Sequence, residues 1–568
     1  MKMKQYIIGI ALLFTSLNFT SCDSFFEAEP QDSVSENGFW KSETDAEKFL
    51  TNLYAKTFPV VYEGSIFFDE AMSDNAYLVW DGWYTDVKLL ANGTQDSYGT
   101  APKNIWQQHY ANIRACWNMI ENIEKIPGLS EASKSCVLGE TRFLMAYNYL
   151  RLIIFFGDVP LVKKVMNIEE SKAIARSPKA DVADFIVEQL DEASAALLSQ
   201  DMDKGRASWG ACQTLKARLY LNMNNYPEVL KVTDGLMGKY ALHTSGETPY
   251  EDLFSGMAEN APEIILSIVR DKSAGSIATG HYSNQIFFMK GMSGGDALIA
   301  ITPSGTLIDS YPMADGRLIH EKGSTYNPKD PYKNRDPRLK QSVVYPTQQL
   351  KYLNAVTGTV EETLFDPEVS TTIPEQQYSA KEPSATGYMW NKYVDWSPYA
   401  MTQITDCTND IILLRYADVL LMRAEAIAET QGIGGKGAVI DLIDQLRVRC
   451  KGGSVHPENY TTNEALINLV RNERRIELAN EGLRYFDILR WKLAEKTPVV
   501  DGVGLKGDFY GAFMRLDGVG SKDRTVEIDG APRRYVETRF FNPAKHYLQP
   551  IPQTEIELNT NLVQNPNW

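Results

Sequence analysis

The sequence of 568 residues is poor in the residue patterns that build metal centres and covalent scaffolds. Its six cysteines are widely spaced and none forms a CxxC pair, which argues against a zinc ribbon and a disulfide-dense scaffold. Its six histidines are scattered, with no HExxH or HxH motif, so no metal site is predicted. We expect the five cysteines after Cys22 to be small buried residues, and we expect no cofactor.

Basic residues are also fewer than acidic ones. The chain has 57 Lys and Arg against 73 Asp and Glu, which gives a formal net charge of −16 and an isoelectric point near 5.1. An acidic surface repels phosphate backbones, so we expect no nucleic-acid partner. The hydrophobic content of 43% and the charged content of 23% are ordinary for a globular protein.

Long apolar runs are absent beyond the N-terminus. There, Lys2 and Lys4 precede the apolar run 6–17, which is too short to span a bilayer comfortably and is typical of a signal peptide. The run leads to small residues before Cys22, as in a lipoprotein signal-peptidase site. We therefore expect residues 1–21 to be removed and Cys22 to carry a lipid anchor. The alternative is a plain secretory signal with an incidental cysteine.

Catalytic motifs are equally sparse. Residues 291–295 satisfy G-x-S-x-G, but Pro303 follows soon and no helical period intervenes, so a nucleophile elbow is not predicted. Residues 432–437 satisfy G-x-G-x-x-G between two predicted helices, which indicates a helix-hairpin turn. We assign no catalytic residue and expect no enzyme. A surface glycoside hydrolase stays open as an alternative, because two carboxylates about 5–10 Å apart suffice for that chemistry.

Helical periodicity dominates both halves of the chain. It predicts single helices over 44–58, 102–120, 131–156 and 181–198. It also predicts two helix hairpins, over 208–237 and 415–450, which loosely match the tetratricopeptide (TPR) pattern. Between 241 and 411, turn-forming residues multiply and the apolar runs shorten, to 263–269 and 285–289, which predicts loops, short strands and small helices. A second loop-rich insertion covers 497–545. The predicted fold is mainly α, a TPR-like α-helical scaffold with long irregular loop and short-strand insertions.

Four parts of the sequence resemble the SusD/RagB family of outer-membrane nutrient-binding lipoproteins. They are LIDSYPMADGRLI (307–319) with NRDPRL (334–339), TGYMWNKYVDW (386–396), RNERRIELANEGLRYFDILRW (471–491) and HYLQPIPQTEIELNTNLVQNPNW (546–568). The resemblance implies a signal peptide over 1–21, a helical SusD-like N-terminal region over 22–240 and a C-terminal region over 241–568. It also implies a lipid-anchored, surface-exposed protein of the outer membrane.

The same resemblance implies a function. Family members capture a glycan, and sometimes a peptide, and pair with a TonB-dependent SusC-like transporter that they cover as a lid. We therefore expect a glycan-binding protein that delivers oligo- or polysaccharide to such a transporter. The alternatives are the glycoside hydrolase and a transporter lid that binds peptide or contacts no ligand.

The family signatures themselves suit a structural role. In 471–491, opposite charges three residues apart predict a helix stabilised along its own surface, through the pairs Arg474–Glu477, Glu481–Arg484 and Asp487–Arg490. The closing segment 546–568 is dense in Pro and Asn, which predicts a chain of turns pinned across the scaffold.

Candidate binding residues follow from sugar chemistry, because carbohydrates offer C–H faces to aromatic rings and hydroxyls to polar side chains. The strongest cluster is an aromatic loop of Trp80, Asp81, Trp83 and Tyr84, with Asn75 upstream. Ordinary packing of these rings under a loop is the competing interpretation. Further candidates are Tyr282, Trp390 and Trp396. Trp390, Tyr393 and Trp396 lie at alternating or near-alternating spacing in a predicted strand, so at least one of the three should face the core.

Overall fold

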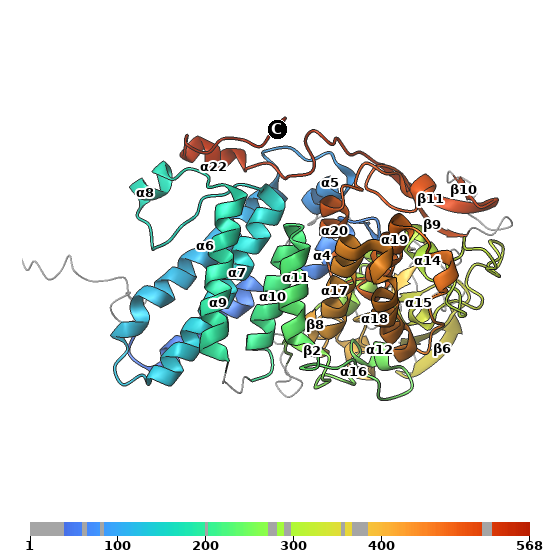
Figure 1. The fold of residues 1–568 in the computed structure, drawn as a ribbon, viewed down its shortest axis with the longest axis horizontal. Coiled ribbons are helices and arrows are strands. Elements are labelled where there is room, and N and C mark those ends of the chain that lie inside the picture. Colours follow the sequence, from blue (N-terminus) through green and yellow to red (C-terminus); the bar gives the residue numbers. More distant parts are fainter. Residues whose placement is uncertain are drawn as a thin grey trace, which may run out of the picture.

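The structure is a computed structural model that describes residues 39–59, 65–79, 85–198, 203–270, 281–288, 297–353, 358–365, 384–513 and 525–568. Cys22 and the aromatic loop 80–84 lie outside these ranges, as does the predicted signal peptide. Long helices stand side by side across the molecule, and short strands and loops gather beyond them at one end (Figure 1). The expected mainly α, TPR-like scaffold is confirmed.

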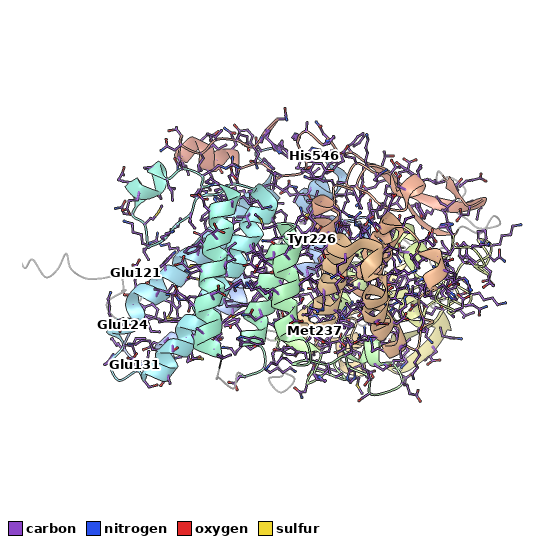
Figure 2. The ribbon with its side chains drawn as sticks, viewed as in Figure 1. Glu121, Glu124, Glu131, Tyr226, Met237 and His546 are labelled. Carbon is purple, nitrogen blue, oxygen red and sulfur yellow. The ribbon has the colours of Figure 1, made fainter. Side chains whose placement is uncertain are left out.

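The N-terminal half is helical almost throughout. Ser130 begins one long helix by accepting a hydrogen bond from the Ser133 N–H, and Gly157, at φ 75°, ends it. Tyr226 and Met237 mark the two ends of the second helix of the first predicted hairpin (Figure 2). The helices are α3 (Glu43–Thr57), α4 (Ile66–Ala71), α5 (Thr85–Asn92), α6 (Thr100–Asn122), α7 (Glu131–Phe156), α8 (Ile168–Ala173), α9 (Lys179–Leu197), α10 (Trp209–Asn222) and α11 (Tyr226–Leu236).

The second predicted hairpin is also present, as α17 (Tyr416–Gln431) and α18 (Lys436–Arg449). The G-x-G-x-x-G motif supplies the 3₁₀ turn between them, Gly432–Gly435, as predicted. The described part of the chain contains no helix that is both long and apolar enough to cross a membrane.

The predicted continuous helix over 471–491 is wrong. The chain forms α19 (Asn463–Glu477) and α20 (Arg484–Arg490), separated by a turn in which Asn480 and Gly482 have φ of 62° and 73°. A Cβ at Gly482 would lie 2.7 Å from Ile66 Cα, so this turn requires glycine. Sequence periodicity missed the break because both segments are rich in helix formers.

Tertiary ion pairs replace most of the predicted pairs along this helix. Of the three predicted pairs, Asp487–Arg490 is present at 2.7 Å. Arg474 instead binds Asp418 at 2.9 Å, and Arg484 binds Asp74 at 2.8 Å. These charges therefore join elements that are far apart in the sequence.

Glu477 lies at the centre of the buried charges. Its carboxylate accepts hydrogen bonds from Arg338 at 2.9 Å, from Arg415 at 2.7 Å and from Arg449, and all four side chains are almost fully buried. Burial alone would raise the pKa of Glu477, but the three guanidinium groups outweigh it and hold the pKa well below its usual value. This cluster fastens α18 and α19 to strand β8 (Ile411–Arg415) and to α15 (Pro337–Ser342).

The strands are short and form small antiparallel pairs, with one three-stranded sheet in the order β10-β11-β9. Of the two short apolar runs in the 241–411 region, 263–269 contains a strand, whereas 283–287 forms a short helix. The strand predicted in 386–396 is reduced to two extended residues. The strands are β1 (Ala76–Leu78), β2 (Ile264–Ile268), β3 (Ile301–Pro303), β4 (Val343–Val344), β5 (Gln349–Leu353), β6 (Val360–Leu364), β7 (Met389–Trp390), β8, β9 (Gly507–Phe513), β10 (Thr525–Ile528) and β11 (Ala531–Arg539).

Short helices fill the loops between these strands. They are α12 (Pro249–Asp252), α13 (Ser283–Phe287), α14 (Gly305–Ser310), α15, α16 (Pro398–Thr402), α21 (Pro498–Asp501) and α22 (Gln553–Leu558). The five described cysteines are free; Cys136 is partly exposed and the other four are buried, close to expectation.

The closing segment 546–568 crosses the tops of the N-terminal helices, and Figure 2 shows His546 at this edge. It consists of turns and loops, as predicted, on either side of the short helix α22, which was not predicted. Asn565 donates to the Phe156 carbonyl at 2.9 Å, and the Gln549 N–H donates to the Phe155 carbonyl at 2.7 Å. The segment thereby satisfies carbonyl groups at the end of α7 that have no partner within the helix.

Candidate functional site

Buried polar contacts fix the segment 70–75, which leads into β1. Asp74 accepts hydrogen bonds from Arg484 at 2.8 and 3.0 Å, and Asn75 donates to Glu70 and accepts from Arg475, both at 2.7 Å. Asn75 is 0% exposed, so a ligand could not reach it in this structure. Its role here is to fix the start of β1, directly upstream of the predicted aromatic loop.

The electrostatics of this segment are those of a structural cluster. Burial would raise the pKa of Asp74, but Arg475 and Arg484 outweigh it and lower the pKa. Glu70 has no comparable partner, and burial raises its pKa to about 7 although Asn75 and the Gly482 N–H donate to it. Glu70 is fully buried and so cannot meet a substrate.

Tyr282 lies at the start of α13 and is partly exposed. The preceding His281 is buried; its Nε2 donates to the Asn409 carbonyl at 2.8 Å and its Nδ1 accepts from the Ser283 N–H. Burial lowers the pKa of His281 to about 4, so the ring is neutral at pH 7 and acts as a fixed hydrogen-bonding wedge. These bonds set the position from which Tyr282 projects.

Trp390 and Trp396 have different environments. A separation of six residues would place both on one face of a continuous strand, but only Met389–Trp390 are extended here. Trp390 is 0% exposed and lies in β7, paired with Val343 of β4. Trp396 is partly exposed; its Nε1 donates to Asn391 Oδ1 at 2.7 Å, and its ring centroid lies 5.1 Å from that of Phe288. Trp396 therefore keeps accessible ring surface, while Trp390 is core packing.

Segments predicted separately meet at this place. Asn284 of α13 donates to the Asp395 carbonyl at 2.8 Å and accepts from the Asp395 N–H at 3.0 Å, which fixes Tyr282 and Trp396 in one block. This block is also connected to β1. The Ile299 N–H donates to the Phe288 carbonyl at the end of α13, and β3, which follows Ile299 in the chain, pairs with β1. We call residues 281–288 with 391–396 the aromatic corner.

A cleft of about 460 Å³ opens beside Tyr282, between α3, β2 and the segment 204–206. Three basic side chains line it. Lys204 pairs with Asp410 at 2.8 Å, and Arg206 lies over the Tyr54 ring at 5.3 Å. The third is Arg270, and burial lowers its pKa, an effect that Asp410 offsets only in part. Sequence reasoning missed these three residues because isolated basic residues carry no spacing signal.

Glu429 and its carboxylate neighbour on α17 do not form an accessible catalytic pair. Burial raises the pKa of the half-buried Glu429, as a glycosidase acid requires. Its carboxylate neighbour four residues earlier is Glu425, which is buried and bound to Arg490 and to the Trp491 indole. Within the described ranges, no three His, Cys, Asp or Glu side chains are placed to hold a metal ion.

Comparison with known proteins agrees with this architecture. Residues 262–568 match the model of the SusD family, and residues 24–221 match a model described as "Starch-binding associating with outer membrane". SusD-like protein P38 of Formosa agariphila is 26% identical, over 86% of this chain and 92% of its own length.

Solved structures give the same result. A SusD-like carbohydrate-binding protein of Bacteroides fragilis is 26% identical, with a TM-score of 0.77 over 92% of this chain and 100% of that one. A second SusD-like protein of B. fragilis is 25% identical, with a TM-score of 0.75 over 95% of this chain and 100% of that one. Because the SusD family model alone covers more than half of the sequence, the chain belongs to the SusD/RagB family.

Proposed function

We propose that this protein is a cell-surface glycan-binding lipoprotein, which captures oligo- or polysaccharide and delivers it to a SusC-like TonB-dependent transporter. The observation that carries the proposal is the aromatic corner in a chain of this family. Its two accessible rings, Tyr282 and Trp396, are fixed on one block by hydrogen bonds. A pre-ordered aromatic surface binds sugar faces without the entropic cost of ordering side chains.

The choice of glycan over other ligands rests on relatives and on the site. A structural relative at 26% identity is described as a carbohydrate-binding protein, and one matching family model is described as starch-binding. We propose Tyr282 and Trp396 as ligand contacts, together with Trp80, Asp81, Trp83 and Tyr84, whose loop follows β1. Asn75 and Trp390 are left out of the proposed contacts because they are fully buried.

We also propose that the protein is held on the outer membrane by a lipid on Cys22. One matching family model is described as associating with the outer membrane, which supports this location. A SusC-like partner is tested by affinity purification of the native protein in mild detergent. A large β-barrel should copurify; recovery of the protein alone from well-solubilised membranes would contradict the partnership.

Binding is tested with Tyr282→Ala and Trp396→Ala against a panel of polysaccharides, by affinity electrophoresis and calorimetry. Each variant should bind about 10–100-fold more weakly, because a central aromatic contact typically contributes that much affinity. The matched control is Tyr98→Ala, which removes a ring that is 65% exposed at another part of the surface. Equal binding by all three variants, with unchanged melting temperatures, would refute the assignment of the aromatic corner.

A further inference from the structure

A second and larger cleft lies apart from the aromatic corner. It has a volume of about 1020 Å³ and is bounded by α19, α14, the segment 491–503 and the turn between β10 and β11. Figure 1 shows α14 and α19 next to each other below this sheet. We call it the α19 cleft. It shares no lining residue with the cleft beside Tyr282, and its volume is at the upper end of the range of about 300–1000 Å³ usual for ligand pockets.

One face of α19 supplies a polar stripe to this cleft. At helical spacing of three and four residues, the stripe consists of Glu464, Asn468, Arg471, Asn472 and Arg475. The opposite face, with Leu466 and Val470, is buried in the core. Arg475 is buried and ties the helix to Asn75, whereas Glu464 and Asn468 are exposed and Arg471 and Asn472 are partly exposed. Four of the five stripe residues are therefore accessible from the cleft.

Arg471 is the partly exposed cation of this stripe. Its guanidinium lies 5.0 Å from the Trp491 ring centroid, and its Nη2 meets Glu429 at 3.4 Å. The Trp491 indole is itself fixed, because its Nε1 donates to Glu425 at 2.7 Å. Arg471 Nε is buried and has no hydrogen-bond partner among the described residues. The Arg471 side chain as a whole keeps 21% of its surface exposed and lines the cleft, so a small shift of the guanidinium would bring this unpaired donor to a ligand oxygen.

Asn472, Asn468 and Glu464 leave acceptors or donors unused as well. Asn472 donates to the Ser310 carbonyl at 2.9 Å, and its Oδ1 accepts nothing from the described part of the chain. Asn468 and Glu464 are exposed and make no side-chain hydrogen bond to any described residue. The cleft thus offers amide, carboxylate and guanidinium groups within one helix face.

The charges in the cleft nearly balance. Five carboxylates stand against four permanent cations, a net of −1, from Asp309, Glu429, Glu464, Asp501 and Asp529 and from Arg471, Arg475, Arg484 and Lys496. Aliphatic surface lies between them, and Val500 is 82% exposed. A polyanion or a polycation has little to gain from such a wall. A polyhydroxylated ligand suits it, because each hydroxyl both donates and accepts and the C–H faces can cover the valines.

We propose that the α19 cleft is a second carbohydrate-binding site, which takes a segment of a neutral oligosaccharide; this rests on the proposed glycan-binding function. A long polysaccharide could then contact the cleft and the aromatic corner together. Once one segment is bound, the other site meets a high effective concentration of the same chain, so affinity rises with chain length.

The test compares Asn468→Trp, which fills the cleft from an exposed position of α19, with Gln445→Trp, the same replacement on the exposed face of α18 outside the cleft. The probes are malto-, laminari-, xylo- and mannohexaose and the corresponding polysaccharides. For a glycan that binds the unmodified protein, Asn468→Trp should reduce hexasaccharide stoichiometry from two to one and weaken polysaccharide binding at least about tenfold. Gln445→Trp should change neither.

Hydrogen exchange provides a readout that needs no variant. The bound hexasaccharide should protect peptides from 463–477 and 496–503 in the unmodified protein. The second site would be overturned if Asn468→Trp kept the stoichiometry of the unmodified protein and these peptides were not protected. If Tyr282→Ala still bound glycan more weakly in that case, the proposed function would stand. No binding of any neutral glycan would overturn both. Protection by a peptide mixture but by no glycan would overturn the carbohydrate assignment.

Discussion

Replacing Glu477 by alanine should lower the free energy of unfolding by about 3–5 kcal/mol, the usual cost of removing one partner from a buried ion pair. The reason is that Arg338, Arg415 and Arg449 all direct guanidinium groups at this carboxylate and have no exposed surface to offer water instead. Glu263 and Glu473 also contact these arginines and keep part of the charge balanced. Without them the loss would be larger.

The assay is urea denaturation at pH 7, followed by tryptophan fluorescence and by circular dichroism. Glu477→Gln keeps the volume and one acceptor oxygen, so its loss should be smaller than that of Glu477→Ala but above 1 kcal/mol, because the charge is still removed. The matched control is Glu228→Ala, whose partner Lys231 is exposed; it should change stability by less than about 0.5 kcal/mol. A loss below about 1 kcal/mol in Glu477→Ala, with an unchanged denaturant slope, would refute the reasoning.

Acid should remove a second stabilising charge, that of Asp418, whose pKa Arg218 and Arg474 lower from 3.8 to about 2 although burial opposes them. The ionised carboxylate therefore contributes about 2 kcal/mol to the free energy of unfolding above pH 4, and this contribution is lost as pH falls towards 2. Asp418→Asn should flatten that part of a curve of stability against pH. Cys22→Ser should release the protein from the outer-membrane fraction, and an unchanged membrane pool would remove the anchor. Trp80→Ala and Trp83→Ala should abolish detectable polysaccharide binding at unchanged melting temperature; a fall in stability of roughly 3–5 kcal/mol with binding retained would instead make these rings core residues.

The helices could be predicted from sequence because their signals are local. The start of α7 at the Ser130 cap and its end at Gly157 need only neighbouring residues, and the same holds for the glycine turn at 432–435. The break at Gly482 could not be predicted, because its cause is contact with Ile66, more than 400 residues earlier.

The candidate site was predictable only as a set of residue types. Aromatic rings beside polar residues singled out both Trp390 and Trp396, but only pairing of β7 with β4 decides that Trp390 is buried. The position of Asn75 upstream of an aromatic loop predicts a ligand contact, but its burial depends on Arg475, which is distant in the sequence. The polar residues of α19 are visible in the sequence, but the cleft that they line also needs residues 491–503 and the turn between β10 and β11. The cleft could therefore not be predicted from the helix alone.

The segment 546–568 has a kinetic consequence. Its hydrogen bond from Asn565 to the Phe156 carbonyl spans 409 residues of chain, and Arg176 reaches Asn565 across 389. Contacts of such long range raise the contact order and slow folding, since the entropy of closing the loop is lost before the contact forms. During synthesis, the C-terminal end of α7 therefore stays uncovered until almost all of the remaining chain has been made.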